Sequence, residues 1–219
     1  LSDIRETGAK PFISISYMPP VISRGDIVDL PANWGDWEAS TQALIEHISG
    51  SANLNISQVY YEVWNEPDLF GNFKTYGDKN YLELYSHTVI GANRASGVNS
   101  FKIGGPATTG FYQNWFEVFI KLVKERNLRL DFLSWHKYSK DIDEYENDIL
   151  EAKRMLEDAG FANNIELLIT EAGPNSENDP VYDTNFSAIH TMALSSLLEG
   201  NIGRLFAFEI KDGPGEKKL

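Results

Sequence analysis

The sequence feature that most constrains the fold is residues 60–68, YYEVWNEPD, where a strand-like run meets an abrupt stop. Large and β-branched side chains are typical of a buried strand, and Pro67 cannot continue a strand because it lacks a backbone N–H. Glu66 is therefore expected at the carboxyl tip of this strand. Residues 165–174 repeat the design, with a hydrophobic run, Glu171 and then a Gly-Pro pair.

Six strand-like segments alternate with helical patterns along the chain. The strands are expected to begin near residues 12, 59, 101, 131, 165 and 204, which lie roughly 30 to 47 residues apart. This spacing matches successive βα units, so we predict a parallel sheet with helices outside it. A doubly wound sheet would usually carry a G-x-G-x-x-G loop after an early strand, and the sequence has none. The prediction is an α/β fold of the (β/α)8 TIM-barrel type.

Polar residues indicate where several helices start. Asp78 is expected to cap one helix, and Asn114 with Glu117 three residues later matches a capping box for the next. Asp183 or Thr184 is expected to cap the last helix. Apolar residues at helical spacing follow each of these positions, so a helix is predicted after each cap.

Composition narrows the classes of partner. The 219-residue chain has a formal net charge of −13, which disfavours nucleic acid, because phosphates require a basic surface. Its apolar runs are far shorter than the roughly 18 residues that span a bilayer, so no membrane segment is predicted. There is no cysteine, and the histidines on predicted helices show no ligand spacing. We therefore predict no metal and no cofactor.

A pair of glutamates at strand tips indicates glycosidic chemistry. Barrel enzymes carry their active sites at the carboxyl ends of the strands, so Glu66 and Glu171 are expected on one rim. Retaining hydrolysis needs one carboxylic acid to protonate the leaving oxygen and one carboxylate to attack the anomeric carbon, about 5–5.5 Å apart. Glutamates at two separate strand ends match this requirement, and we predict that they form the catalytic pair.

Strand parity selects further candidates. His136 and Tyr138 share parity on one strand, so both can face the barrel interior and bind a sugar hydroxyl or the nucleophile. Lys137 between them is expected to turn away. Glu62 has the parity of Glu66 but lies two rungs lower, and we expect it to be a paired charge inside the barrel.

Two residues near other strand ends are candidates for sugar contact. Tyr17 follows the first strand and could stack on a sugar face. Glu209 lies near the end of the last strand and could face the sugar. Aromatic residues at strand spacing are usually part of the core, and the role of Glu209 is open.

Short motifs run along most of the chain in a fixed order. They are FISISYMPP (12–20), the helix of residues 37–47, YEVWNEPD (61–68), GGP (104–106), DFLSWHKY (131–138), LITE (168–171) and PVYDT (180–184). Together they resemble glycoside hydrolase family 39, the clan A group that contains β-xylosidases and α-L-iduronidases. One such motif would be weak support, whereas the ordered set is specific.

The resemblance implies an eight-stranded barrel of which this chain supplies strands three to eight. Residues 1–219 are therefore expected to form a partial TIM-barrel catalytic domain. Because the sequence starts inside a predicted helix, we expect a fragment whose first two βα units come from the same precursor or from another chain. An open barrel would leave the edges of its outermost strands exposed to pairing.

The resemblance also implies roles for individual residues. Glu66 matches the acid/base of the family and Glu171 its nucleophile. Asn65 matches the asparagine that binds the 2-hydroxyl of the sugar, a contact that strengthens in the transition state. The strand tips alone predict the same pair of glutamates, and the resemblance adds which of the two is the acid/base and which the nucleophile.

The sequence leaves the substrate open among carbohydrates. We favour a β-xyloside or a related neutral sugar, since β-xylosidase-like members need a neutral pocket. Asp68 and Lys137 resemble the iduronidase side, so a uronide hydrolase is the alternative, and a barrel that binds sugar without catalysis is another. A secreted or periplasmic location follows only from the family's usual substrates, and the cellular location stays open.

Overall fold

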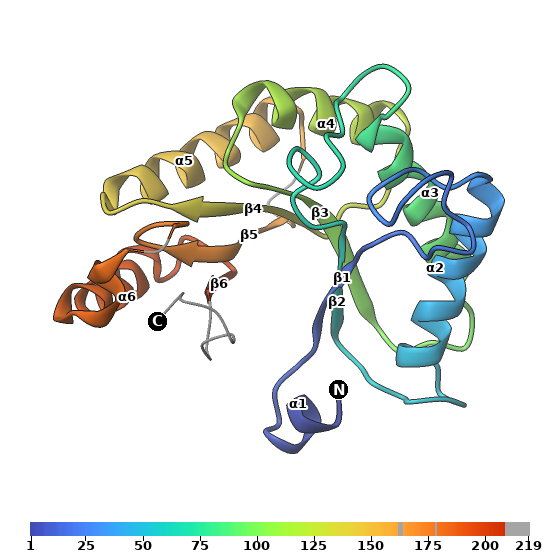
Figure 1. Ribbon diagram of the computed structural model, residues 1–219, viewed down its shortest axis with the longest axis horizontal. Coiled ribbons are helices and arrows are strands. Elements are labelled where there is room, and N and C mark those ends of the chain that lie inside the picture. Colours follow the sequence, from blue (N-terminus) through green and yellow to red (C-terminus); the bar gives the residue numbers. More distant parts are fainter. Residues whose placement is uncertain (162–163, 178, 209–219) are drawn as a thin grey trace.

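The protein is one curved sheet of parallel strands with helices on its outer side (Figure 1). The computed structural model describes residues 1–161, 164–177 and 179–208. The six strands are hydrogen-bonded in chain order, each parallel to the next. They are β1 (Phe12–Ile15), β2 (Val59–Val63), β3 (Phe101–Thr108), β4 (Phe132–Tyr138), β5 (Glu166–Gly173) and β6 (Arg204–Ala207). This arrangement confirms the predicted TIM-barrel type with about six βα units.

The helices follow the strands in alternation, as the apolar periodicity predicted. They are α1 (Ser2–Glu6), α2 (Trp34–Ser49), α3 (Tyr81–Arg94), α4 (Gln113–Glu125), α5 (Asp143–Asp158) and α6 (Asn185–Leu198), with a 3-10 helix η1 (Pro180–Asp183) before α6. Helices α2 to α5 cover the convex face of the sheet (Figure 1). Helix α6 packs against η1 and β5.

Two of the predicted helix caps are wrong. The side chain of Asn80, and not that of Asp78, caps α3 by accepting a hydrogen bond from the Leu82 amide at 2.9 Å. Backbone hydrogen bonds between residue 74 and residues 79 and 81 hold the chain in a turn until Asn80, so the helix cannot start earlier. Thr184 does cap α6, as predicted.

Helix α4 starts one residue before the predicted capping box. Its N-cap position is Tyr112, which makes no side-chain cap hydrogen bond, and Asn114 lies inside the first turn. The phase of the helix is instead set by packing, because Trp115 and Phe116 are buried in the core. Burial of such aromatic side chains stabilises by about 1.5–3 kcal/mol each, more than the roughly 1 kcal/mol of a cap.

Residues that point outward from the sheet form the main core with the helices. Tyr61, Leu133 and Trp135 are fully buried there among apolar residues of the helices. The indole of Trp37 donates a 2.8 Å hydrogen bond to the Thr88 hydroxyl, which joins α2 to α3. This outer core holds the strands in register and so fixes where their carboxyl ends lie.

Residues that point into the concave face form three layers. Nearest the amino ends of the strands is an aromatic layer of Phe12, Tyr60, Phe132 and Leu168. Above it lies a polar layer of Ser14, Glu62, Ser134 and Thr170. A carboxyl layer of Glu66, His136 and Glu171 follows at the carboxyl ends. The chemistry-bearing residues are therefore gathered at one end of the barrel interior.

A β-bulge in β5 brings Glu171 into this interior. Trp135 pairs with Ile169, but His136 pairs with Glu171, so Thr170 is an extra residue on β5. Without this insertion Glu171 would have the opposite parity to Leu168 and would point outward. The bulge re-aims the glutamate at the concave face, a use of bulges that is common next to active sites.

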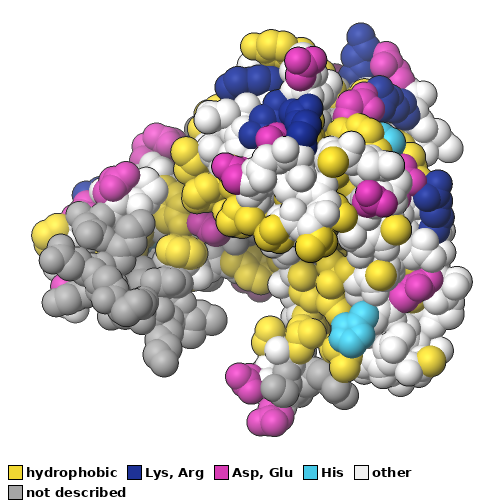
Figure 2. Space-filling view, turned by 45° about the vertical axis from the view of Figure 1, so that its right-hand side comes forward, with side chains coloured by type: hydrophobic (Ala, Val, Ile, Leu, Met, Phe, Trp, Pro, Cys, Tyr) yellow, Lys and Arg dark blue, Asp and Glu magenta, His cyan; other side chains and the backbone are white. Residues whose placement is uncertain are grey.

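Figure 2 shows where hydrophobic and basic side chains lie on one face of the molecule. Hydrophobic side chains line the hollow at its lower centre, whereas lysine and arginine side chains gather over its upper and right-hand parts. Among the described residues, no helix combines the length and apolar character needed to cross a membrane.

Candidate active site

Glu66 lies in a tight turn directly after β2. Trp64 and Glu66 have positive φ angles of 72° and 46°, which end the strand just before Pro67. The Glu66 amide donates to the carbonyl of Ala107 at 2.9 Å, and its own carbonyl accepts from the amides of residues 69 and 70. The backbone at Glu66 is therefore fixed both to the end of β3 and to its own turn.

Asp68 holds the same turn against β3. Its carboxylate accepts a 3.0 Å hydrogen bond from the Thr109 amide and a second from the Thr109 hydroxyl. That hydroxyl is also 2.8 Å from the phenolic oxygen of Tyr112. Asp68 thus helps to position the loop that carries Glu66, through a partner 41 residues away that no local pattern indicates.

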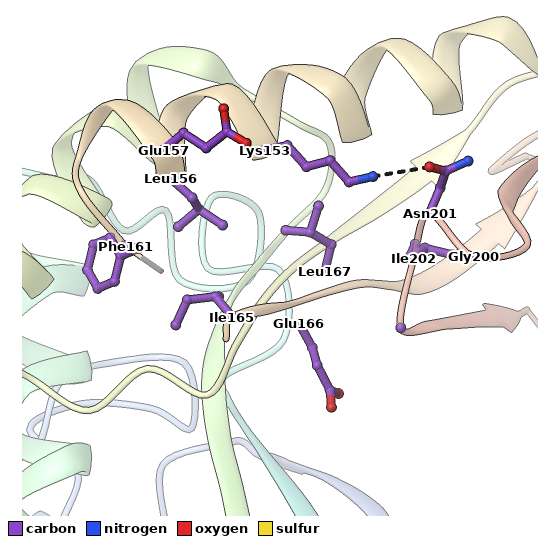
Figure 3. A pocket seen from close by; sticks show the side chains of 11 residues that line it. Lys153, Leu156, Glu157, Phe161, Ile165, Glu166, Leu167, Gly200, Asn201 and Ile202 are labelled. Carbon is purple, nitrogen blue, oxygen red and sulfur yellow. Dashed lines mark hydrogen bonds between the residues drawn. The ribbon is translucent and has the colours of Figure 1, made fainter. Parts of the chain in front are cut away.

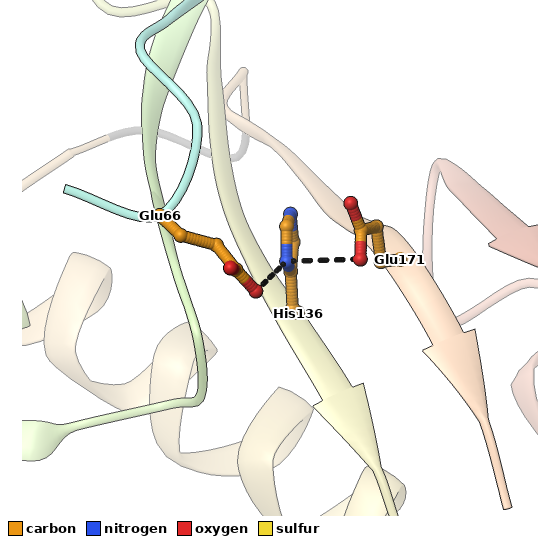
Figure 4. Close-up of side chains that lie close together, drawn as sticks. All are labelled: Glu66, His136 and Glu171. Atoms are coloured by element: carbon orange, nitrogen blue, oxygen red, sulfur yellow. Dashed lines mark hydrogen bonds and ion pairs between the residues drawn. The ribbon is translucent and has the colours of Figure 1, made fainter. Parts of the chain in front are cut away.

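His136 lies between the two predicted catalytic glutamates (Figure 4). Its Nδ1 is 2.8 Å from Glu66 Oε1 and 3.4 Å from Glu171 Oε2. The His136 side chain is 1% exposed, whereas those of Glu66 and Glu171 are 14% and 23% exposed. The carboxylates therefore face solvent from either side of a buried imidazole.

The charge of this imidazole depends on the carboxylates around it. Burial disfavours the charged form, but the hydrogen bond to Glu66 and the charge of Glu171 raise the pKa of His136 above its ordinary value. The strands β2, β4 and β5 each contribute one of these groups at or near a strand end. Their convergence confirms that the strand tips meet on one rim.

Tyr138 supports Glu171 from the side. Its hydroxyl donates a 2.9 Å hydrogen bond to Glu171 Oε2. Burial and the neighbouring carboxylate raise the pKa of Tyr138, so it stays a neutral phenol that donates. Its inward direction agrees with the predicted parity.

Lys137 points away from the interior, as parity predicted. Its ammonium lies 3.0 Å from Glu144 Oε2 and 3.1 Å from Asp148 Oδ2, both on α5. Because both contacts are on the outer face of the sheet, this lysine is not available to the carboxyl layer.

The other predicted site residues have different placements. Asn65 is half-buried between Trp64 and Glu66. Tyr17 makes edge contacts with the rings of Trp64 and Phe70, with ring centres 5.3 and 5.7 Å away. Glu209 lies outside the described residues.

Glu62 lies inside the barrel, as predicted, and is 2% exposed. The positive group that acts on it is the imidazole of His136, and among the described residues no ion pair joins it to a lysine or arginine. The Ser14 hydroxyl donates to Glu62 Oε2 at 3.3 Å. Burial raises the pKa of Glu62, while His136 and the hydroxyls around it oppose that change.

The geometry permits two kinds of chemistry. The three donor atoms of Glu66, His136 and Glu171 lie within 4.8 Å of one another, a spacing that a divalent cation could use. The same spacing places two carboxylates close enough to act on one bond. The prediction of a site without metal stays a prediction.

The carboxyl layer is distinct from a pocket at the opposite end of β5. That pocket of about 450 Å³ is lined by residues from α5, from the start of β5 and from residues 200–203 (Figure 3). Lys153 and Asn201 are hydrogen-bonded across it at 3.1 Å. It lies at the amino ends of the strands, the face of a barrel that serves stability rather than catalysis.

Comparison with known proteins identifies similar sequences. The family model for "Glycosyl hydrolases family 39" matches residues 1–196. A beta-xylosidase of Caldicellulosiruptor saccharolyticus is 26% identical over 196 residues, covering 83% of this chain and 38% of that protein. A beta-xylosidase of Geobacillus stearothermophilus is 29% identical over 140 residues, covering 59% of this chain and 27% of that protein.

Solved structures share the fold. A monomeric beta-xylosidase from Caulobacter crescentus CB15 has a TM-score of 0.79 and 24% identity, covering 94% of this chain and 46% of that chain. A GH39 enzyme from Xanthomonas axonopodis pv. citri has a TM-score of 0.79 and 20% identity, and the match covers 94% of this chain and 45% of that chain. The chain thus spans less than half of the length of each of these relatives.

Proposed function

The chain belongs to glycosyl hydrolases family 39, which confirms the resemblance carried by its motifs, and from that premise we propose that it holds the catalytic pair of a retaining glycosidase. Glu66 is the acid/base and Glu171 the nucleophile. The observation that carries the proposal is their spacing, with one oxygen of each carboxylate within 4.8 Å of the other and an imidazole between them. Carboxylates that approach each other in this way can act on the same glycosidic bond, as the retaining mechanism requires.

The reaction follows from these two positions. In the first step Glu66 gives its proton to the leaving oxygen while a Glu171 oxygen bonds to the anomeric carbon and the glycosidic bond breaks. In the second step Glu66 takes a proton from water, whose oxygen replaces Glu171 on that carbon. Each carboxyl group ends in its starting form, so the cycle needs no other reactant.

The neighbours of the pair have supporting roles in this proposal. Tyr138 orients Glu171 through its hydrogen bond, and His136 holds the two carboxylates apart at a fixed distance. Asn65 binds the 2-hydroxyl of the sugar, a contact that strengthens as the transition state forms. Tyr17 contributes a sugar contact, and Glu209, which lies outside the described residues, is the other candidate from the sequence for such a contact.

The proposed substrate is a neutral sugar, a β-xyloside or a close relative. A uronide hydrolase needs a basic group for the substrate carboxylate, and Lys137 was the candidate in the sequence. Lys137 is instead bound by Glu144 and Asp148 on the far side of the sheet. Asp68, the other feature shared with the iduronidase side, is occupied by Thr109. Both contacts favour the neutral sugar.

We also propose that residues 1–219 are part of a catalytic barrel that further βα units complete, from the same precursor or another chain. In the part of the chain that the structure describes, β1 and β6 each pair with one neighbour only. Static light scattering tests this proposal. Self-association or capture of added barrel units is expected, and a stable monomer that binds no such units would contradict it.

Covalent trapping tests the proposed mechanism. An activated 2-deoxy-2-fluoro-β-xyloside is expected to leave one sugar adduct on Glu171, because fluorine slows hydrolysis of the glycosyl-enzyme. Intact mass and peptide mapping measure it, and the Glu171→Gln variant, which keeps the shape of the side chain, is the control. An adduct on another residue would overturn the assignment of the nucleophile.

A further inference from the structure

The polar layer beneath the catalytic pair contains a glutamate that the mechanism does not use. Glu62 on β2 is buried, and hydroxyl groups from three strands surround it. Ser14 on β1 donates to it at 3.3 Å, while Ser134 on β4 and Thr170 on β5 lie close enough to lower its pKa. Gly104, its partner on β3, offers no side chain.

Several atoms of this layer have unfilled hydrogen bonds. Glu62 Oε1, Ser134 Oγ and Thr170 Oγ1 are all buried, and each has no hydrogen bond of good geometry among the described residues. Unfilled polar atoms are costly in a barrel interior, and an ionised carboxylate costs more than a neutral one. A proton on Oε1 would make Glu62 a donor to either hydroxyl.

The charged surroundings also favour a neutral Glu62. The cation that acts on it is His136, which already faces Glu66 and Glu171. On the α3 side the titratable group is Tyr81. Its hydroxyl donates to the Val63 carbonyl, so it is a neutral phenol and brings no positive charge to Glu62. An ionised Glu62 would therefore share this one imidazole with the carboxylate of Glu171, and also with Glu66 once that acid has given up its proton.

Thr170 links this layer to the candidate nucleophile. It is the extra residue of the β5 bulge, and Glu171 follows it directly. A group that holds the Thr170 side chain in the interior therefore also fixes the bulge. The direction of Glu171 depends on that bulge, as its parity shows.

We propose that Glu62 is a positioning residue that works as a neutral carboxylic acid, whose hydrogen bonds within the polar layer hold the Thr170 bulge and so aim Glu171 at Glu66. The role of Glu171 in this statement rests on the proposed function. The protonation of Glu62 and its hold on the bulge do not.

A titration of the parent protein tests the protonation. The side-chain carboxyl carbons of ¹³C-labelled glutamates are followed by NMR, and Glu62→Gln assigns the Glu62 signal. The signal is expected to keep its protonated position at pH 7. A Glu62 signal that titrates at or below the ordinary value of about 4.3 would overturn the proposal.

Paired variants test the positioning. Gln keeps a donor and an acceptor at residue 62, whereas Leu removes both. Glu62→Leu is expected to move the amide NMR signals of Thr170 and Glu171 and to lower kcat at least tenfold below Glu62→Gln. Tyr60→Phe, one layer below on the same strand, controls for a lost hydrogen bond away from the bulge.

Two outcomes of the variant experiment count against the proposal. Equal signals and equal kcat in Glu62→Gln and Glu62→Leu would show that the hydrogen bonds do not hold the bulge. The same would follow if Tyr60→Phe moved the Thr170 and Glu171 signals as far as Glu62→Leu. If the chain has no glycosidase activity, kcat cannot be measured, but the NMR measurements can still be made. Failure of the proposed function can therefore be told apart from failure of this proposal.

Discussion

Strand β5 carries a glutamate at each end of the barrel interior, and the two have opposite surroundings. Glu166, at the amino end, forms a salt bridge with Lys102. Glu171, at the carboxyl end, accepts a hydrogen bond from Tyr138 and faces the imidazole of His136. The same residue type on the same strand is paired with a fixed cation in one place and with titratable or neutral donors in the other.

The amino end is built for cohesion. The Tyr60 hydroxyl donates to Glu166 at 2.9 Å, and Lys102 and Arg204 both lie over the Tyr60 ring, 5.2 and 5.0 Å from its centre. In the same layer as Tyr60, the Phe132 ring packs against the rings of Phe12 and Tyr60. Among the described residues, Tyr60, Glu166, Lys102 and Arg204 each have a hydrogen bond or an ion pair within this group.

The carboxyl end is suited to a change of charge. In the proposed mechanism Glu171 bonds to carbon and is released again, which needs partners that do not hold it permanently. His136 and Tyr138 meet that need, because one can change its charge and the other is neutral. The two ends differ in the partners of their glutamates and not in residue type, and under the proposed function these partners decide which glutamate reacts.

The largest expected effect is on kcat, and it separates the two glutamates of β5. Glu171→Gln should lower kcat on a β-xyloside by about 10⁴ or more, the scale seen when a nucleophile is removed. Glu166→Gln should leave kcat within roughly threefold of the parent, because its contacts lie at the far end of the strand. Initial rates with a chromogenic xyloside measure both.

An equal loss of kcat in both variants would contradict the contrast between the two ends, because it would mean that the amino end also serves the reaction. Circular dichroism spectra of the two variants supply the control for folding. Rescue of a Glu171→Gly variant by added azide or formate would support the assignment, since truncation makes room for a small anion to attack the carbon in place of the lost carboxylate.

The aromatic layer predicts the next largest effect, and it concerns stability. Phe132 is fully buried and its ring lies 5.6 Å from that of Tyr60 and 5.6 Å from that of Phe12. Phe132→Ala should lower the free energy of unfolding by about 3–5 kcal/mol. Urea unfolding measures the change, and Phe132→Leu, which fills most of the space, should lose less than half of it.

A loss below about 1 kcal/mol in Phe132→Ala would contradict the view of the amino end as the cohesive end. The matched test at the other end is Tyr138→Phe, which removes a hydroxyl without leaving a cavity. It should change the free energy of unfolding by about 1 kcal/mol or less. The two measurements together sharpen the contrast between a stabilising end and a reactive end.

Much of this contrast could be predicted from the sequence, because strand tips and parity are local properties. Pro67 and the Gly-Pro pair after Glu171 marked where the strands stop, and parity placed His136 inside and Lys137 outside. These signals depend on residues within a few positions of each other, so one chain is enough to see them.

The parts that the sequence did not reveal depend on contacts between distant segments. Nothing near Thr170 announces a bulge, because the bulge is defined by the register of β5 against β4. Asp68 and Glu62 could not be assigned for the same reason, since their partners lie on other strands or loops. The start of α4 was missed because packing of Trp115 outweighs the local cap.

The pH dependence of stability gives a smaller effect at the carboxyl end. The pKa of His136 is higher in the folded protein, because the hydrogen bond to Glu66 and the nearby carboxylates outweigh burial. The stabilisation from this shift is fully present below the unfolded value of about 6.5 and is lost as the pH rises through the folded value.

His136→Gln tests that sign. The difference in the free energy of unfolding between parent and His136→Gln should be larger at pH 5.5 than at pH 9, as measured by urea unfolding. His47→Gln, at an exposed position on α2, controls for the loss of an imidazole. A difference that grows with pH would show that burial dominates and that His136 is neutral when folded.

The smallest effect is expected for the ion pair at the amino end. Lys102 and Glu166 are 39% and 31% exposed, so water and salt screen their attraction. Lys102→Met should lower the free energy of unfolding by about 1 kcal/mol or less, and the loss should shrink further in 1 M salt. A loss of several kcal/mol that salt does not reduce would mean that the pair is effectively buried. Glu166 at the amino end would then be held as tightly as Glu171 at the carboxyl end. A difference in activity between variants of these two glutamates would have to come from the contacts of Glu171 with His136 and Tyr138 alone.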